Sequence, residues 1–234
     1  MMKIKAIQKT TLIDYPGKIA CTIFIHGCNF KCGFCHNPEL VIYEKEKDIN
    51  ENEILTFLEK QRKYLEGVCI SGGEPLISLN SEFIKKIKSM GYLIKIDTNG
   101  SYPDKLSELI SKNLVDYIAM DIKSSRENYP KLVNSRVNLN KIEESIKIIS
   151  SLPDYEFRTT IIEEIHSKEE VEKIIKWVSE FAGKKIKRFV FQGFKKQHKI
   201  IDDKFKNYKD TNEEYLYKLK GIAQEYCNEV IIKA

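Results

Sequence analysis

Six short apolar runs, each followed by a segment with helical periodicity, constrain the fold of this 234-residue chain. The runs are rich in Ile, Val, Phe and Tyr, which is typical of β-strands. They span Ala20 to His26, Val68 to Ser71, Tyr92 to Thr98, Tyr117 to Ile122, Phe157 to Ile162 and Phe189 to Gln192. Successive strands separated by helices predict a parallel sheet, because parallel strands need helical crossovers. We therefore predict an α/β fold.

Amphipathic segments fill the intervals between these runs. Their apolar residues recur every three or four positions, as on one face of a helix. The predicted faces include Ile54 with Leu58, Phe83 with Ile84 and Ile87, Leu106 with Leu109, Ile142 with Ile146 and Ile149, and Leu216 with Leu219. Ser167 and Glu170 form a capping box before a further helix that ends near Gly183. The length favours one domain spanning residues 1–234.

Each conspicuous polar motif follows one of the predicted strands directly. A cysteine-rich loop comes after the first strand, Ser71 to Pro75 after the second, Asp97 to Gly100 after the third, and Asp121 to Lys123 after the fourth. In parallel α/β folds, ligands collect at the C-terminal ends of the strands. We expect these motifs to form one binding region.

The cysteine-rich loop carries Cys28, Cys32 and Cys35 in a C-x3-C-x2-C spacing. Thiolates are the usual protein ligands of a [4Fe–4S] cluster, and three of them leave one iron open. This spacing resembles the signature of radical S-adenosylmethionine enzymes, in which S-adenosylmethionine chelates the open iron. The triplet therefore predicts a catalytic iron–sulfur site rather than a structural metal site.

The cysteines could also be interpreted as a structural zinc site or as disulfide-bonded residues. Cys28, Cys32, Cys35 and His36 could form a Cys3His zinc site, but structural zinc motifs usually come as two separated ligand pairs, and the sequence has no second pair. Disulfides are not expected, because the N-terminal residues do not resemble a secretory signal. The remaining cysteines, Cys21, Cys69 and Cys227, are interpreted as small buried side chains.

The other motifs also carry ligand-binding chemistry. Gly72 and Gly73 allow a close approach of the backbone, and Glu74 offers an acceptor for an ammonium group such as that of methionine. Gly-Gly-Glu-Pro alone could be an ordinary turn, but the upstream cysteines favour a functional one. Asp97 and Asp121 could face one ligand or bind a cation together, and Lys123 could pair with a carboxylate or contact a ribose. Solvent-exposed caps and turns are the alternative for these residues.

The composition limits the partners. With 39 basic and 34 acidic residues the formal charge is +5, and the lysines alternate with Glu and Ile along predicted helices. This pattern favours solvated helix faces over nucleic-acid binding. No apolar run reaches about 18 residues, so we expect no membrane span. A cytoplasmic location fits these features.

The stretch Thr11-Leu12-Ile13-Asp14-Tyr15-Pro16-Gly17, together with Gly27-Cys28 and Cys35-His36-Asn37-Pro38-Glu39-Leu40, resembles the activating enzymes of glycyl radical enzymes. Within that group it is most similar to the activating protein of anaerobic ribonucleoside-triphosphate reductase. The similarity continues through the Gly-Gly-Glu-Pro, Asp-Thr-Asn-Gly and Met-Asp-Ile-Lys segments. It covers the first half of the chain closely and the remainder mainly in its βα pattern.

This resemblance implies a role for each matching residue. Cys28, Cys32 and Cys35 would hold one [4Fe–4S] cluster, with Phe34 and His36 beside the adenine of S-adenosylmethionine. Gly72, Gly73 and Glu74 would meet the methionine amino group, and Lys123 would contact the cofactor. Asp97, Thr98 and Asp121 match positions that bind a monovalent cation in related activases. The implied fold is a partial (β/α)6 barrel, open on one side.

The implied activity is that of an oxidoreductase that activates a glycyl radical enzyme. Reductive cleavage of S-adenosylmethionine to methionine and a 5′-deoxyadenosyl radical would be followed by hydrogen abstraction from a glycine of the partner. Flavodoxin or ferredoxin would supply the electron, in an anaerobic cytoplasm. Alternatives are radical modification of a small molecule or of RNA, and a zinc-binding module without catalysis.

The chain departs from related activases in two places. Phe191-Gln192-Gly193-Phe194 stands where pyruvate formate-lyase activases carry Pro-Tyr-His, so the adenine or ribose contact there is unassigned. The sequence lacks the cysteine-rich insert that houses auxiliary clusters in several relatives, so we expect a single cluster. The charged connection from Lys195 to Asn212 either flanks the entrance for the partner or is a disordered surface loop.

Overall fold

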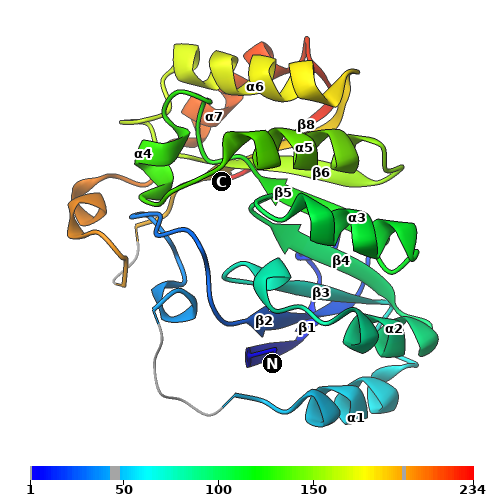
Figure 1. Cartoon of the computed structure of the whole chain (residues 1–234). Helices are drawn as coiled ribbons and strands as arrows, with labels where there is room; N and C mark the ends of the chain where they lie inside the picture. Colours follow the sequence, from blue (N-terminus) through cyan, green and yellow to red (C-terminus); the bar gives the residue numbers. More distant parts are fainter. Residues whose placement is uncertain (1, 43–47, 197–198) are drawn as a thin grey trace. The chain divides into compact units, whose positions relative to one another are not determined.

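The computed structural model describes residues 2–42, 48–196 and 199–234 (Figure 1). These residues form two compact units. Unit 1 comprises Met1–Asn29, Glu39–Thr98 and Asp104–Ile118, and unit 2 comprises Phe30–Pro38, Asn99–Pro103 and Ala119–Ala234. A single radical S-adenosylmethionine domain over the whole chain stays a prediction.

Unit 1 is built on the first four strands and the start of the fifth. These are β1 (Ile4–Thr11), β2 (Ala20–Ile25), β3 (Gly67–Gly72), β4 (Leu93–Thr98) and β5 (Tyr117–Asp121). The strands β2, β3 and β4 pair in parallel, and β1 pairs with β2 in the antiparallel sense. The helical elements are η1 (Pro38–Leu40), α1 (Glu51–Gln61), η2 (Pro75–Ile77), α2 (Ser81–Ser89) and α3 (Pro103–Ser111).

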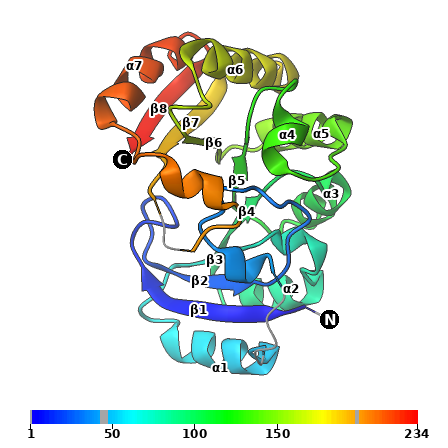
Figure 2. The same ribbon diagram turned by 90° about the vertical axis from the view of Figure 1, so that its left-hand side faces the viewer.

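Unit 2 contains the end of β5 and three further strands, β6 (Tyr155–Ile161), β7 (Ile186–Gly193) and β8 (Cys227–Lys233). The pairs β6–β7 and β7–β8 are parallel. The helical elements are α4 (Tyr129–Val133), α5 (Leu139–Ser150), α6 (Lys168–Ala182), η3 (Asp203–Asn207) and α7 (Glu213–Ala223). Helix α6 packs against β7, and α7 packs against both β7 and β8 (Figure 2).

The described residues contain eight strands, hydrogen-bonded in the order β1 to β8 with β1 and β8 as the two edges. This order gives an open, mostly parallel α/β sheet, which confirms the predicted fold class. All six predicted strands are present. The strands β1 and β8 were not predicted, because β1 is an edge strand with two lysines among its eight residues and β8 has a short apolar run. Such polar edges are typical, since they discourage pairing with other chains.

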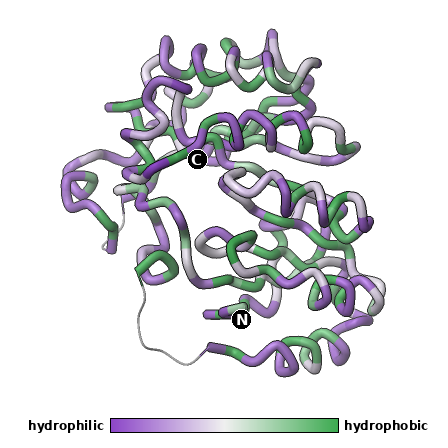
Figure 3. The backbone as a smooth tube through the Cα atoms, in the orientation of Figure 1, coloured by the Kyte–Doolittle hydropathy of each residue, from purple (hydrophilic) through white to green (hydrophobic). Residues whose placement is uncertain are grey.

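The predicted helix faces are buried within their own units. Ile54, Leu58, Phe83, Ile84 and Ile87 lie in the core of unit 1, and Ile142, Ile146, Ile149, Val171, Ile174 and Val178 in that of unit 2. Hydrophobic and hydrophilic residues alternate along the helices accordingly (Figure 3). The Ser167 side chain accepts a hydrogen bond from the Glu170 amide, and Gly183 ends α6 in the left-handed conformation. The Ser167 half of the predicted capping box is therefore confirmed, whereas the Glu170 carboxylate binds Ser124, Ser125 and Asn128 instead of the Ser167 amide.

Candidate functional site

The cysteine triplet is divided between the two units. Cys28 belongs to unit 1, and Cys32 and Cys35 belong to unit 2. Cys32 is buried, the other two are half-buried, and none of the chain's six cysteines, all of them described, forms a disulfide. The Cys35 amide donates to the Cys32 carbonyl at 3.0 Å, so these two residues share a tight turn. Among the described residues, no three His, Cys, Asp or Glu side chains stand together as metal ligands.

Within unit 2, the loop around Cys32 is held from two directions. The Lys31 amide donates to the Val133 carbonyl at the end of α4, at 3.0 Å. On the other side, the Asp202 amide donates to the Gly33 carbonyl at 3.1 Å. The ring of Phe205, in η3, packs on Gly33 and lies 5.8 Å from the ring of Phe34.

These contacts bear on the charged connection between Lys195 and Asn212. Its residues 199–212 have a defined structure in which Phe205 is buried, so a disordered surface loop is the wrong interpretation for them. Residues 197 and 198 of the connection lie outside the described part. A role beside a partner entrance stays a prediction.

By residue type, the three cysteines are the usual protein ligands of an iron–sulfur cluster. Burial raises the pKa of the Cys32 thiol to about 11, although the nearby Lys123 charge acts in the opposite direction. A metal ion deprotonates a coordinating thiol outright, so cluster binding would release the Cys32 proton. The neighbouring lysine would then face a thiolate rather than a neutral thiol.

His36 is a half-buried imidazole with an unused hydrogen-bonding atom. Its ring lies 5.8 Å from that of Phe194, and its Nε2 is buried without a hydrogen-bond partner among the described residues. Burial lowers the pKa of His36, and the Lys123 charge lowers it further, which favours the neutral ring. A buried polar atom without a partner is costly, and a ligand group could satisfy it.

The Gly-Gly-Glu-Pro segment lies at the end of β3 in unit 1. A Cβ at Gly72 would lie 2.2 Å from the Ile25 carbonyl oxygen, and a Cβ at Gly73 would lie 2.2 Å from that of Gly27. Gly72 also has a φ of +126°. The space freed by the missing side chains is therefore filled by the chain's own backbone. The two glycines have a structural reason to be there, independent of any ligand.

Glu74 is fully buried in unit 1. Its Oε1 accepts hydrogen bonds from the Leu76 amide at 3.2 Å and from the Thr98 hydroxyl at 2.9 Å. The first bond caps η2, and the second ties the end of β4 to the turn after β3. Glu74 and Thr98, both predicted site residues, are thus brought into direct contact.

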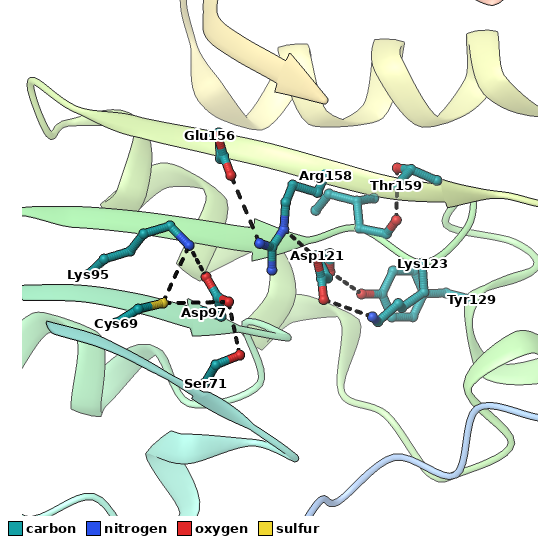
Figure 4. Close-up of polar contacts among 11 residues, drawn as sticks. Cys69, Ser71, Lys95, Asp97, Asp121, Lys123, Tyr129, Glu156, Arg158 and Thr159 are labelled. Carbon is teal, nitrogen blue, oxygen red and sulfur yellow. Dashed lines mark hydrogen bonds and ion pairs between the residues drawn. The ribbon is translucent and has the colours of Figure 1, made fainter. Parts of the chain in front are cut away.

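Asp97 lies in a buried polar cluster on β3 and β4, which Figure 4 shows. Its Oδ1 pairs with the Lys95 ammonium, and its Oδ2 accepts from the Ser71 hydroxyl at 2.9 Å. The Cys69 sulfur lies 3.8 Å from the Lys95 nitrogen. Sequence reasoning did not select Lys95, whose side chain is 1% exposed. The sequence did offer one indication of Lys95, namely a charged residue within an apolar strand. Such a lysine is expected to be paired, because buried lysines are rare unless they have a partner.

Asp121 forms a second charged cluster, inside unit 2 (Figure 4). Its Oδ2 lies 2.9 Å from the Lys123 ammonium, and its Oδ1 lies 2.9 Å from Nε of Arg158. Burial alone would raise the pKa of Asp121, but the charges of Arg158 and Lys123 outweigh it and hold that pKa well below its ordinary value. Burial lowers the pKa of Lys123, but Asp121 more than compensates, and the net change is upward. Arg158, on β6, was also missed by sequence reasoning.

Side chains of unit 2 bind the backbone of the segment Asp121–Lys123. The carbonyls of Asp121, Ile122 and Lys123 lie within hydrogen-bond distance of the Tyr129 hydroxyl, the Thr159 hydroxyl and Nε2 of His166, at 3.3, 2.9 and 3.1 Å. Nδ1 of His166 accepts from the Ile162 amide at 3.1 Å, so the ring proton is on Nε2. The imidazole therefore joins the end of β6 to the segment that carries Lys123.

Glu170, at the start of α6, fixes the next two residues. Its Oε1 accepts from the Ser124 hydroxyl at 2.7 Å and from the Ser125 amide at 2.9 Å, and its Oε2 accepts from the Asn128 side chain at 2.9 Å. The sequence predicted Glu170 as a capping residue alone. In the structure the Glu170 carboxylate instead anchors the segment following β5, and only its amide takes part in the cap, by donating to Ser167.

An α/β fold with the cysteine triplet after its first parallel strand defines a class of protein. The model of the Radical SAM superfamily matches residues 22–178, and the chain belongs to this superfamily. Membership implies a [4Fe–4S] cluster and S-adenosylmethionine as cofactors. No helix in the described ranges is both long and apolar enough to cross a membrane.

Individual relatives narrow the comparison. A Methanocaldococcus jannaschii protein, provisionally named a glycyl-radical enzyme activating enzyme, is 32% identical over 98% of this chain and 95% of its own length. The pyruvate formate-lyase-activating enzyme of Clostridium pasteurianum is 33% identical over 53% of each chain. The structure of Streptococcus suis SuiB bound to S-adenosylmethionine superposes with a TM-score of 0.68 at 16% identity, over 88% of this chain and 48% of that one. SuiB supports the fold alone.

Proposed function

We propose that this chain activates a glycyl radical enzyme. The observation that carries the proposal is similarity along almost the full length, 98% of this chain and 95% of the relative, to a protein named for that activity. The matching region includes the cysteine triplet and the motifs after β3, β4 and β5. Pyruvate formate-lyase-activating enzymes match over about half of the chain, which supports the same class of reaction.

The residues of this chain have distinct tasks in the proposed reaction. Cys28, Cys32 and Cys35 would hold the cluster, which when bound would pass on the electron needed for reductive cleavage of S-adenosylmethionine. Gly72, Gly73 and Glu74 would meet the methionine amino group, and Lys123, which pairs with Asp121 in this structure, would contact the cofactor. The protein contributes mainly positioning, as is usual for cofactor chemistry.

The adenine side of the cofactor is assigned to Phe34 and His36. The ring of Phe34 is buried and packs against that of Phe205, so its position beside the adenine is assigned from the resemblance. His36 has a buried Nε2 with no partner in the described part of the chain. A nucleobase offers both a flat face and polar edges, which suits this pair of side chains.

The partner we propose is an anaerobic ribonucleoside-triphosphate reductase, whose activating protein the cysteine region resembles most. Hydrogen would be abstracted from a glycine Cα of that reductase. A flavodoxin or ferredoxin would act as electron donor, in an anaerobic cytoplasm. These assignments go together, because an oxygen-sensitive cluster and a glycyl radical both require the absence of air.

The test is anaerobic reconstitution followed by reaction with a candidate reductase. We expect about four irons per chain, an electron paramagnetic resonance signal that changes with S-adenosylmethionine, and a glycyl doublet on the reductase. Cys32→Ala should lose the cluster, whereas Cys227→Ala, a buried cysteine outside the triplet, should keep it. Release of methionine without a glycyl signal on any candidate would contradict the proposal and favour another substrate.

A further inference from the structure

We propose that Lys95 supplies, inside this protein, the positive charge that a bound monovalent cation supplies to Asp97 in related activases. The chain would then need no such cation. Asp97, Thr98 and Asp121 match the cation-binding positions, so the inference rests on the cofactor site proposed above. The contacts of these three residues, taken unit by unit, carry it.

Lys95 is placed to act as a permanent counter-ion. Side chains alternate along a strand, so Lys95 and Asp97 extend to the same face of β4. The Lys95 side chain is 1% exposed and that of Asp97 is 17% exposed, and their charged groups are in direct contact. A lysine this deeply buried needs a charged partner, and Asp97, the predicted cation ligand, is such a partner.

Both carboxylate oxygens of Asp97 are engaged by side chains of unit 1. Lys95 contacts Oδ1, while the Ser71 hydroxyl donates to Oδ2 at 2.9 Å. The Thr98 hydroxyl, another predicted ligand, is directed to Glu74 at 2.9 Å. A cation entering here would face the Lys95 ammonium across a few ångströms, and like charges at that separation repel strongly when little water intervenes.

Asp121 is compensated independently within unit 2. Lys123 and Arg158 each lie 2.9 Å from one of its two oxygens. Two positively charged side chains therefore pair with the one carboxylate of Asp121. The second positive charge is balanced by Glu156, which lies 3.9 Å from Arg158. Neither predicted carboxylate ligand carries an excess negative charge that would attract a further cation.

The test compares thermal unfolding of the protein without cluster or cofactor in potassium, sodium and choline chloride. Each salt is used at about 0.1 M, so that general screening is equal. We expect the wild-type Tm to be the same in all three salts. A Tm raised by potassium or sodium relative to choline would overturn the inference.

Lys95→Ala provides the converse test. Removing the ammonium takes away the positive charge that contacts Oδ1 of Asp97, so potassium or sodium should now raise the Tm relative to choline. The double variant Lys95→Ala/Asp97→Asn should lose this response, because the charge to be neutralised is gone. Ile96→Ala, at a buried neighbouring position of β4, should lower the Tm equally in the three salts.

Equal unfolding of Lys95→Ala in all three salts would also contradict the proposal. If that variant does not fold, Lys95→Met removes the charge while keeping most of the side-chain volume, and the wild-type comparison remains decisive. Since no cluster, cofactor or partner is present, failure here is distinguishable from failure of the proposed activity.

Discussion

Phe205 occupies the space that a side chain at Gly33 would need. A Cβ built at Gly33 would lie 2.5 Å from Cε2 of Phe205 and 2.8 Å from the Asp202 Cβ. The glycine between Cys32 and Phe34 is therefore part of a packing contact between the cysteine loop and the segment around η3. This contact gives the loop a support from residues about 170 positions further along the chain.

Gly33→Ala should destabilise unit 2 through this contact. Overpacking of a filled site typically costs about 1–3 kcal/mol, and we expect that loss in the free energy of unfolding measured with urea. In a Phe205→Ala background the same substitution should cost less, because the obstructing ring is absent. An equal cost in both backgrounds would show that the two residues are not coupled.

Gly72→Ala should be far more damaging than a substitution at another glycine with positive φ. At Gly72 the new Cβ would overlap the Ile25 carbonyl, whereas at Gly91, with φ of +92°, it would meet nothing within 4 Å. We expect Gly91→Ala to cost about 1–2 kcal/mol for its conformation alone. Gly72→Ala should cost clearly more or prevent folding, as measured by soluble yield and urea unfolding. Comparable stabilities would disprove the close backbone packing.

Arg158→Met should reveal the ionised state of Asp121. Because the folded pKa of Asp121 lies below its unfolded value of about 3.9, its ionisation stabilises the protein above about pH 4, and this contribution is lost as the pH falls through the folded pKa. The variant should be less stable by about 2 kcal/mol near neutral pH, since hydrogen bonds to charged groups contribute roughly 1.5–3 kcal/mol.

The gap in stability between wild type and Arg158→Met should narrow as the pH falls below the folded pKa of Asp121 in the variant, which loss of the Arg158 charge raises, because the unfolded chains of both proteins bind the same proton. Urea unfolding between about pH 3 and 7 measures it. Lys173→Met, which removes an exposed ion pair with Glu127, serves as a control and should have little effect. A gap that is the same at both ends of the range would contradict the role assigned to Asp121.

His166→Gln should change the dependence of stability on pH. Burial lowers the pKa of His166, so between about pH 6.5 and its folded pKa the unfolded chain takes up a proton that the folded chain resists. Stability therefore falls as the pH decreases through this window. The variant should lose this part of the slope in urea unfolding, while His36→Gln should remove a separate part, because the pKa of His36 is also lowered by burial. An unchanged slope in His166→Gln would refute the assignment.

The main features of the fold could be predicted from the sequence, because helix and strand periodicities are local. The six runs became strands, and the Ser167 and Gly183 signals marked the ends of α6. The edge strand β1 was missed, since its polar residues give no strand alternation. Helix α4 was missed because it is five residues long and contains Pro130 in its first turn.

Candidate site residues could be selected from the sequence where residue types at a fixed spacing indicate a function. They could not be selected where their role depends on contacts between strands. The cysteine triplet and the motifs after β3, β4 and β5 could be selected from their residue types. Lys95 and Arg158 could not, because a single charge in an apolar run does not show which carboxylate it pairs with. The roles of Gly33 and Gly72 also needed the structure, since the groups that exclude a side chain there come from distant segments.

Three successive carbonyls, those of Asp121, Ile122 and Lys123, already accept bonds from Tyr129, Thr159 and His166. The backbone carbonyls of this segment are thus already hydrogen-bonded within the protein. A cofactor bound at this segment, as proposed above, would therefore be contacted mainly by its side chains, which single substitutions can alter without disturbing the path of the backbone. The segment is thus a natural place for ligand preference to diverge among proteins that share this framework.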